Sequence, residues 1–222
     1  MSHTEGRVIL PKQTFDNLQE DKKQRIIQSA LVEFIDKGYE KGNIEVIAKS
    51  AGVSKGSMYQ YFINKKDLYI YLVEYVIKLT QDAIKKYMNE ENVTDIYDLF
   101  YEGNKALWPV MNQYINESLF VERAQEEADL EIRQAIKDLS GVYTQHMYIP
   151  IIEEQKRAGK IRTDIDSEMI LLYLEGVSIR FKRHVVELAR KSGKNMLELE
   201  FETFDQILCD MRELLRNGML GK

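Results

Sequence analysis

The ten-residue stretch VSKGSMYQYF, residues 53–62, combines groups that can contact a polyanion with groups that can hold a short helix in place. Its apolar members, Val53, Met58 and Phe62, can face inward together from one side of a short helix. The opposite side keeps the polar members and a glycine, namely Lys55, Gly56, Ser57, Tyr59, Gln60 and Tyr61. A recognition helix divides in this way, because one side packs on a scaffold and the other meets DNA. The stretch therefore predicts a DNA-recognition helix.

Two kinds of contact are expected from this surface. The hydroxyl groups of Ser57 and Tyr59 can donate to phosphate oxygens, which positions a helix without reading sequence. Lys55 and Gln60 can reach base edges, lysine at guanine and glutamine at adenine. Gly56 costs roughly 1 kcal/mol relative to alanine inside a helix, so a close approach of its backbone to another surface explains it better.

A longer helix is predicted before this stretch and would form its scaffold. The apolar residues of about 19–37 fall on one face, and Gly38 suits the left-handed residue that ends a helix. Residues 1–18 show no convincing period and are expected to form a flexible arm, although the apolar residues 8–10 and Phe15 can pack on the body.

Two short helices complete a helix-turn-helix unit. The first covers about 44–50 and follows Asn43, a good N-cap. Gly52 then breaks the chain, and Ser54 can cap the helix over 55–62. Three helices of which the last two are joined by a tight turn are typical of helix-turn-helix proteins.

Charge is distributed unevenly along the chain. The net charge is −5, but residues 1–66 hold 11 Lys and Arg against 8 Asp and Glu, a net of +3, which leaves 20 against 28, or −8, for the rest. A local basic face is compatible with DNA, because phosphate contacts depend on the nearby field and not on the isoelectric point. An ordinary solvated surface is the alternative.

These residues resemble the DNA-binding domain of the tetracycline-repressor (TetR/AcrR) family over about Lys22 to Leu68. The resemblance is carried by IIQSA at 26–30 with Phe34, by Gly38-Tyr39, and by 47–56, 58–62 and 64–68. It implies phosphate contacts for Ser57, Tyr59 and Lys65. It also implies that four residues face bases or nearby backbone, namely Lys55, Gly56, Gln60 and Tyr61.

One position departs from the family pattern, and three side chains have alternative roles. The family usually has two hydroxyl residues before the second helix, where this chain has Gly42-Asn43; Asn43 can still cap the helix and contact phosphate. For Tyr59 and Tyr61 the alternative is packing against the following long helix, and for Lys65 it is a solvated charge.

Residues 67–222 are predicted to form a larger helical domain, and the whole chain is expected to be all-α. Helices are expected over about 67–89, 94–107, 111–128, 129–159, 167–192 and 197–217. Pro109 is expected to end one of them and Pro150 to kink another. The resemblance implies that this half binds a ligand and dimerises.

The resemblance also implies that the last two helices pack against their copies in a four-helix bundle. Apolar residues three and four apart support such a seam. The expected interface residues are Tyr173, Val177, Phe181, Phe204, Leu208, Met211 and Leu215. The alternative is that both helices bury these residues within their own chain.

A ligand site is expected among aromatic and polar residues of the middle helices. The candidates are Tyr101, Asn104, Trp108, Tyr114, Phe120, Arg123, Tyr143, His146, Met147 and Tyr173. Ordinary core packing is the alternative for each of them. Three dispersed histidines and the single Cys209 indicate no metal site, and no cofactor is expected.

The sequence thus predicts a homodimeric DNA-binding regulator, a repressor of a palindromic operator that is released by a small-molecule effector. Without a signal segment or a long apolar run, the chain is expected to be soluble and cytoplasmic, with no membrane partner. One alternative is an architectural or division-related DNA binder without an effector. The other is an enzyme in the helical half, which no nucleophile motif or phosphate loop supports.

Overall fold

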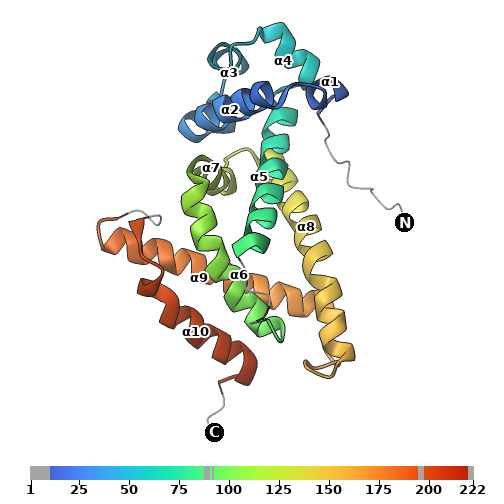
Figure 1. Cartoon of the computed structure of the whole chain (residues 1–222), viewed down its shortest axis with the longest axis vertical. Coiled ribbons are helices and arrows are strands. Elements are labelled where there is room, and N and C mark those ends of the chain that lie inside the picture. The colour runs from blue at the N-terminus through green and yellow to red at the C-terminus, as the bar shows by residue number, and fades with distance from the viewer. Residues whose placement is uncertain (1–10, 88–90, 92, 195–197, 220–222) are drawn as a thin grey trace. The chain divides into compact units, whose positions relative to one another are not determined.

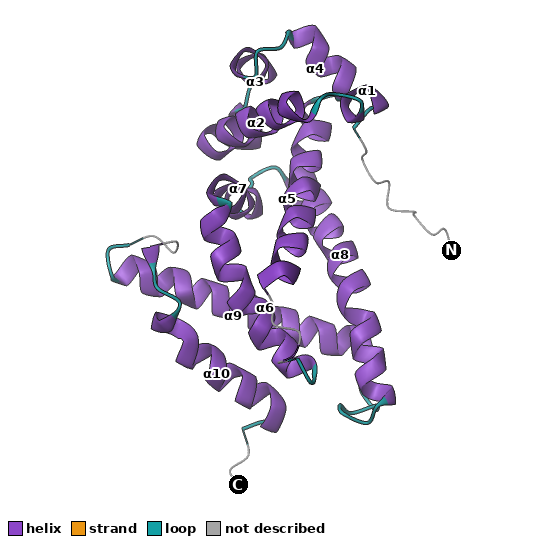
Figure 2. Ribbon diagram, viewed as in Figure 1, coloured by secondary structure: helices purple, strands orange, loops and turns teal. Residues whose placement is uncertain are grey.

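The computed structural model describes residues 11–87, 91, 93–194 and 198–219. Within these residues the regular elements are helices and there is no strand, which confirms the all-α prediction (Figure 2). The helices are α1 Gln13–Asp16, α2 Glu20–Lys41, α3 Ile44–Ser50, α4 Lys55–Tyr61, α5 Lys65–Tyr87, α6 Ile96–Gln113, α7 Ile115–Gln125, α8 Leu130–Arg157, α9 Ser167–Lys191 and α10 Glu202–Asn217. None of the described helices combines the length and apolar composition needed to cross a bilayer.

The chain divides into two compact units, and each is built from two separate segments. The first unit comprises Met1–Leu79 and Tyr114–Val142, and the second comprises Thr80–Gln113 and Tyr143–Lys222. The first therefore contains the predicted helix-turn-helix together with much of α5, all of α7 and the start of α8. The functional boundary expected after residue 66 remains a proposal.

The core of the first unit is a set of aromatic rings contributed by α2, α5 and α7. Phe34 and Tyr69 have ring centroids 4.9 Å apart, and Tyr69 and Phe120 lie 5.1 Å apart. All three side chains are fully buried. Aromatic pairs at these separations add to the stabilisation from burial, so α7 holds α2 and α5 in place.

A break in α2 creates a polar contact in this core. Gly38 has φ 69° and ψ −179°, which confirms the expected positive-φ glycine at the end of the first long helix. The Tyr39 N–H and the Tyr69 hydroxyl both donate to Oε1 of the buried Glu127, each at 2.9 Å. Burial, and then the Glu127 carboxylate, raise the pKa of Tyr69 far above its ordinary value. A Cβ at Gly38 would lie 2.6 Å from a guanidinium nitrogen of Arg123, so no side chain fits there without movement.

The predicted arm is wrong in part. Residues 13–16 form α1, and Phe15 is 1% exposed, which confirms its expected packing on the body. A single turn of helix is too short to show a hydrophobic period, so the sequence pattern could not reveal it. The prediction for residues 8–10 lies outside the described residues.

In the second unit α6 packs against α10 through aromatic residues. Trp108 and Phe204 have ring centroids 4.5 Å apart, and Phe181 lies 5.8 Å from Phe204. The Tyr101 hydroxyl donates to Asp205 at 2.7 Å. Burial and this carboxylate raise the pKa of Tyr101. Nearer the end of α10, one guanidinium nitrogen of Arg216 donates to Asp95 and Asp98, each at 2.8 Å.

The prolines behave differently from the prediction. Pro109 does not end its helix, because α6 continues to Gln113. Proline removes one helical hydrogen bond, and packing of the neighbouring Trp108 and the buried Val110 offsets that loss. The chain instead leaves the helix at Tyr114, with φ −117° and ψ 63°. Pro150 lies inside α8, and a kink there remains a prediction.

Candidate DNA-binding surface

Side-chain caps fix the start of both short helices, as predicted. Asn43 Oδ1 accepts from the Glu45 N–H at 2.8 Å, which caps α3. Ser54 Oγ accepts from the Ser57 N–H at 3.0 Å, which caps α4. Gly52, with φ 70°, makes the turn between the two helices. These caps set where α4 begins and therefore which of its residues face outward.

The outward side of α4 carries most of the predicted contact residues. Lys55, Gly56, Tyr59 and Gln60 are exposed, and Ser57 is half-buried. The inward residues Met58 and Phe62 are 1% and 3% exposed. A Cβ at Gly56 would meet no atom closer than the Ser54 Oγ, at 3.8 Å. Among the described residues of this unit, nothing therefore requires glycine at this position.

Tyr61 does not belong to this surface, so its predicted outward placement is wrong. Its side chain is 6% exposed and lies edge-on to Phe15, with ring centroids 5.8 Å apart. Tyr61 follows Met58 by three residues and shares its inward side of the helix. The alternative of packing is therefore correct, although the partner ring comes from α1.

Lys65 has an internal role that sequence reasoning missed. Its ammonium group donates to the backbone carbonyls of Glu40 at 2.8 Å and Gly42 at 3.1 Å. It also lies 4.8 Å from the ring centroid of Tyr39. Lys65 thus joins the start of α5 to the end of α2. An ammonium group has three donors, so one remains for an outside partner, and a phosphate contact stays a proposal.

Lys55 forms an exposed ion pair. Its ammonium nitrogen lies 3.0 Å from Glu45 Oε2, and both side chains are more than half exposed. The hydrogen bond to Glu45 raises the pKa of Lys55. Exposed pairs of this kind contribute little to stability, so Lys55 is free to exchange Glu45 for another partner.

Comparison with known proteins assigns this surface to a family. Residues 26–72 match the bacterial regulatory proteins of the tetR family. Over 155 residues the chain is 26% identical to IcaR of Staphylococcus aureus strain Newman, the negative transcriptional regulator of the biofilm operon icaADBC. That match covers 69% of this chain and 80% of IcaR.

Residues 26–72 therefore carry a DNA-binding domain of the tetR family of bacterial regulators. The homologues of this chain are tetR-family transcriptional regulators, which are not enzymes.

Solved structures of TetR-family regulators share the fold of this chain. A TetR-family regulator from Chloroflexus aurantiacus has a TM-score of 0.63 and 24% identity, covering 96% of this chain and 100% of its own. FadR from Bacillus subtilis, solved with stearoyl-CoA, has a TM-score of 0.67 and 19% identity, covering 89% of this chain and 99% of its own. At these identities the likeness is one of fold.

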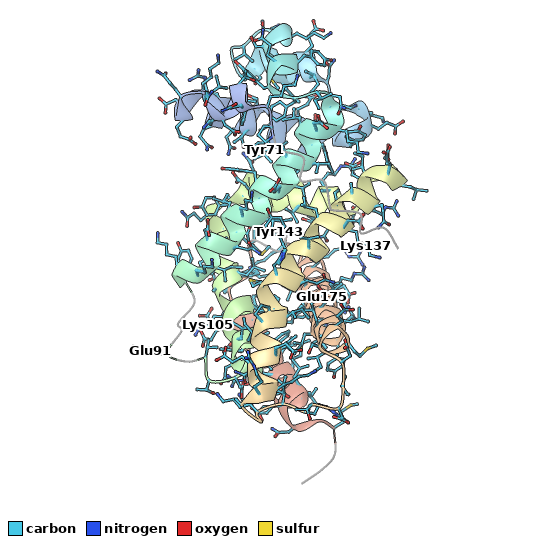
Figure 3. The ribbon with its side chains drawn as sticks, turned by 90° about the vertical axis from the view of Figure 1, so that its right-hand side faces the viewer. Tyr71, Glu91, Lys105, Lys137, Tyr143 and Glu175 are labelled. Carbon is cyan, nitrogen blue, oxygen red and sulfur yellow. The ribbon has the colours of Figure 1, made fainter. Side chains whose placement is uncertain are left out.

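The ten predicted ligand residues of this regulator do not share one environment. Tyr114, Phe120 and Arg123 belong to the first unit, and the other seven belong to the second. Phe120 is fully buried in the first core, and Tyr101 and Trp108 lie in the α6–α10 core, so ordinary packing accounts for these three. The remaining seven positions are Asn104, whose amide donates to the Phe100 carbonyl, half-buried Tyr114, Arg123 and Tyr143, and exposed His146, Met147 and Tyr173 (Figure 3 labels Tyr143 on α8).

One cavity of about 480 Å³ lies within the first unit, where α2 meets the end of α7. Among the predicted ligand residues, Arg123 lines it. Most of the lining side chains are charged: Asp36, Lys37, Glu40, Lys41, Arg123, Glu126 and Glu127. Such a lining suits water and small polar solutes better than an apolar ligand.

The predicted dimer seam is largely buried inside its own chain. Phe181, Phe204 and Leu208 are 5%, 2% and 0% exposed, so the alternative of burial within the chain is correct for them. Val177, Met211 and Leu215 pack partly buried against the same core. Tyr173 alone among the seven is largely exposed, at 61%. A different face of α9 is therefore available to a partner.

That face, here called the α9 stripe, consists of exposed apolar residues three or four apart with a glycine among them. Its members are Met169, Leu172, Tyr173, Gly176 and Ile179. The four side chains are each more than half exposed. The spacing of apolar residues in the sequence could not distinguish this face of α9 from the buried one, because both faces are apolar.

Proposed function

We propose that this regulator is a repressor that binds a palindromic operator as a homodimer and is released by a small-molecule effector. The observation that carries the proposal is the outward side of α4, where Lys55, Tyr59 and Gln60 are exposed around the unobstructed backbone of Gly56. A helix with this surface, capped and seated on a helix-turn-helix scaffold, fits the major groove. Repression is also what the name of the similar IcaR states for that protein.

Dimerisation is proposed through the α9 stripe. Exposed apolar side chains that cluster in one patch mark protein–protein interaction sites. Leu214 of α10 is also exposed, at 49%, and supplies a second apolar contact. A two-fold dimer uses the same patch on both copies and presents two recognition helices to two half-sites.

The effector is proposed to be a small molecule bound by the second unit. The similar FadR was solved with stearoyl-CoA, which makes that acyl-CoA the first compound to test. Weaker operator binding in its presence would support this ligand class. If the protein binds many unrelated sites and ignores metabolites, the architectural alternative gains support instead.

Replacing both Leu172 and Tyr173 with glutamate is expected to give a folded monomer. Two negative charges on the α9 stripe oppose self-association, and both side chains are exposed, so the fold should survive. Binding both half-sites through one linked dimer raises operator affinity roughly 100-fold or more. Loss of the dimer should therefore lower operator affinity by about that factor. Light scattering and DNA titration measure the two effects.

The control for this variant is Gln145→Glu, which adds a negative charge at an exposed position of α8 in the same unit. It should remain dimeric with full operator affinity. If the Leu172 and Tyr173 variant is still dimeric, the α9 stripe is not the interface.

Gln60→Ala is expected to reduce sequence preference. We propose that Gln60 reads a base, so its truncation should cost about 1–3 kcal/mol on the operator and much less on random DNA. Lys65→Ala should weaken binding to the operator and to random DNA alike. The slope of log affinity against log salt concentration should fall by about one unit, as expected for one lost phosphate contact. Competition titrations at several salt concentrations separate the two behaviours. Equal loss on all sequences for Gln60→Ala would contradict base reading.

A further inference from the structure

The C-terminal end of α4 is not stabilised by interactions within the helix itself. α4 has seven residues, and helices this short are not stable alone in water. Ser54 caps its first turn, but the last carbonyls of any helix have no partner within that helix. The chain turns to extended backbone at Phe62, with φ −126° and ψ 144°. Partners for these carbonyls must therefore come from elsewhere.

They come from Lys12, just before α1, and from Thr14 in α1. The Lys12 ammonium donates to the Tyr59 carbonyl at 2.7 Å, and the Thr14 hydroxyl donates to the Gln60 carbonyl at 2.6 Å. The Lys12 N–H donates to the Tyr61 carbonyl at 2.9 Å. Three consecutive carbonyls at the end of α4 are thus satisfied from one short segment. A lysine at a helix C-terminus also interacts favourably with the helix dipole.

A buried aromatic ring holds that segment against α4 and α5. Phe15 is 1% exposed, and its ring centroid lies 4.9 Å from that of Phe62 and 5.3 Å from that of Tyr71. Figure 3 labels Tyr71 on α5, and Figure 1 shows α1 beside the end of α4. Burial raises the pKa of Tyr71, which keeps its hydroxyl neutral in this contact. Phe15 therefore fixes Lys12 and Thr14 opposite the carbonyls that they bind.

We infer that Lys12, Thr14 and Phe15 form a clamp that orients the end of α4 for DNA, with Lys12 and Thr14 as positioning residues. The clamp binds the backbone of Tyr59 and Gln60, whose side chains are exposed on the proposed DNA-facing side. The effect on DNA rests on the proposed function. The effect on the order of α4 does not, since it follows from the hydrogen bonds alone.

The decisive variant is Thr14→Val, because it removes a donor at nearly constant volume and changes no charge. Loss of this hydrogen bond should reduce amide-exchange protection at the end of α4 several-fold and operator affinity by about 3- to 10-fold. Lys12→Met in the same chain should deepen both losses. Protection in α2 should stay unchanged, and Lys12→Arg should retain most of the affinity.

The matched control is Gln13→Ala, at an exposed position of α1 between the two positioning residues. It should leave exchange in α4 and operator affinity unchanged. Unchanged exchange in α4 for the Lys12→Met, Thr14→Val double variant would overturn the clamp. So would a uniform loss on all DNAs from Lys12→Met with no effect of Thr14→Val, because Lys12 would then simply contact phosphate.

The two readouts also separate the clamp from the proposed function. Amide exchange is measured on the protein without DNA, so it tests the clamp even if no operator is found. If exchange in α4 increases while the wild-type chain binds no specific DNA, the clamp stands and the regulatory proposal fails.

Discussion

Leu208→Asp is expected to unfold the second unit and not to yield a folded monomer. Leu208 is fully buried among α6, α9 and α10 residues, including Phe181 and Phe204. Truncating a buried leucine to alanine already costs about 2–5 kcal/mol, and an unpaired buried carboxylate costs more. The total is a large part of the ~5–15 kcal/mol free energy of unfolding of a typical domain. Urea unfolding followed by circular dichroism measures the loss.

Leu214→Asp on the same helix is the matched control. Leu214 is 49% exposed, so the same charge should leave the unit folded and should affect only association. A well-folded Leu208→Asp monomer would show that Leu208 faces a partner and that the buried placement is incorrect.

Gly56→Leu is expected to separate stability from DNA binding. A leucine at this exposed helical position meets no neighbouring atom near its Cβ and has a higher helix propensity, so the protein should become more stable by about 0.5–1 kcal/mol. If the backbone of Gly56 approaches DNA closely, the added side chain obstructs the interface. Operator affinity should then fall by about 1–3 kcal/mol, roughly 5- to 150-fold.

Thermal melts and operator titrations measure these opposite changes. Gly141→Leu provides the control, because Gly141 lies inside α8 and a Cβ there meets nothing within 4 Å. It should leave operator binding intact. An unchanged operator affinity for Gly56→Leu would show that this part of α4 stays away from DNA.

Local signals in the sequence were sufficient to predict the ends of the DNA-binding helices. Asn43 and Ser54 cap the helices that they were expected to cap, and Gly38 and Gly52 adopt positive φ. Each of these features depends on a few adjacent residues. Capping chemistry and glycine conformation are therefore readable without knowledge of the rest of the fold.

Pairing between distant segments was not readable in the same way. The apolar period of α10 correctly marked Phe204 and Leu208 as facing a hydrophobic partner, but that partner is the chain's own α6 and α9. Tyr61 was similarly paired with a ring of α1, a helix too short to have a period. Lys65 binds two carbonyls more than twenty residues away. A period identifies a face but not what covers it.

The two-segment construction of the first unit bears on the order in which the chain can fold. Residues 26–72, which match the tetR family, do not include two groups that contact Tyr69. These are the ring of Phe120 in α7 and the carboxylate of Glu127. Those groups follow Tyr69 by about fifty residues or more, so they leave the ribosome several seconds later at ~5–20 residues per second. Until then the DNA-binding helices have an incomplete core. During synthesis the nascent chain therefore passes through a period in which its recognition helix exists without the support that would fix its geometry.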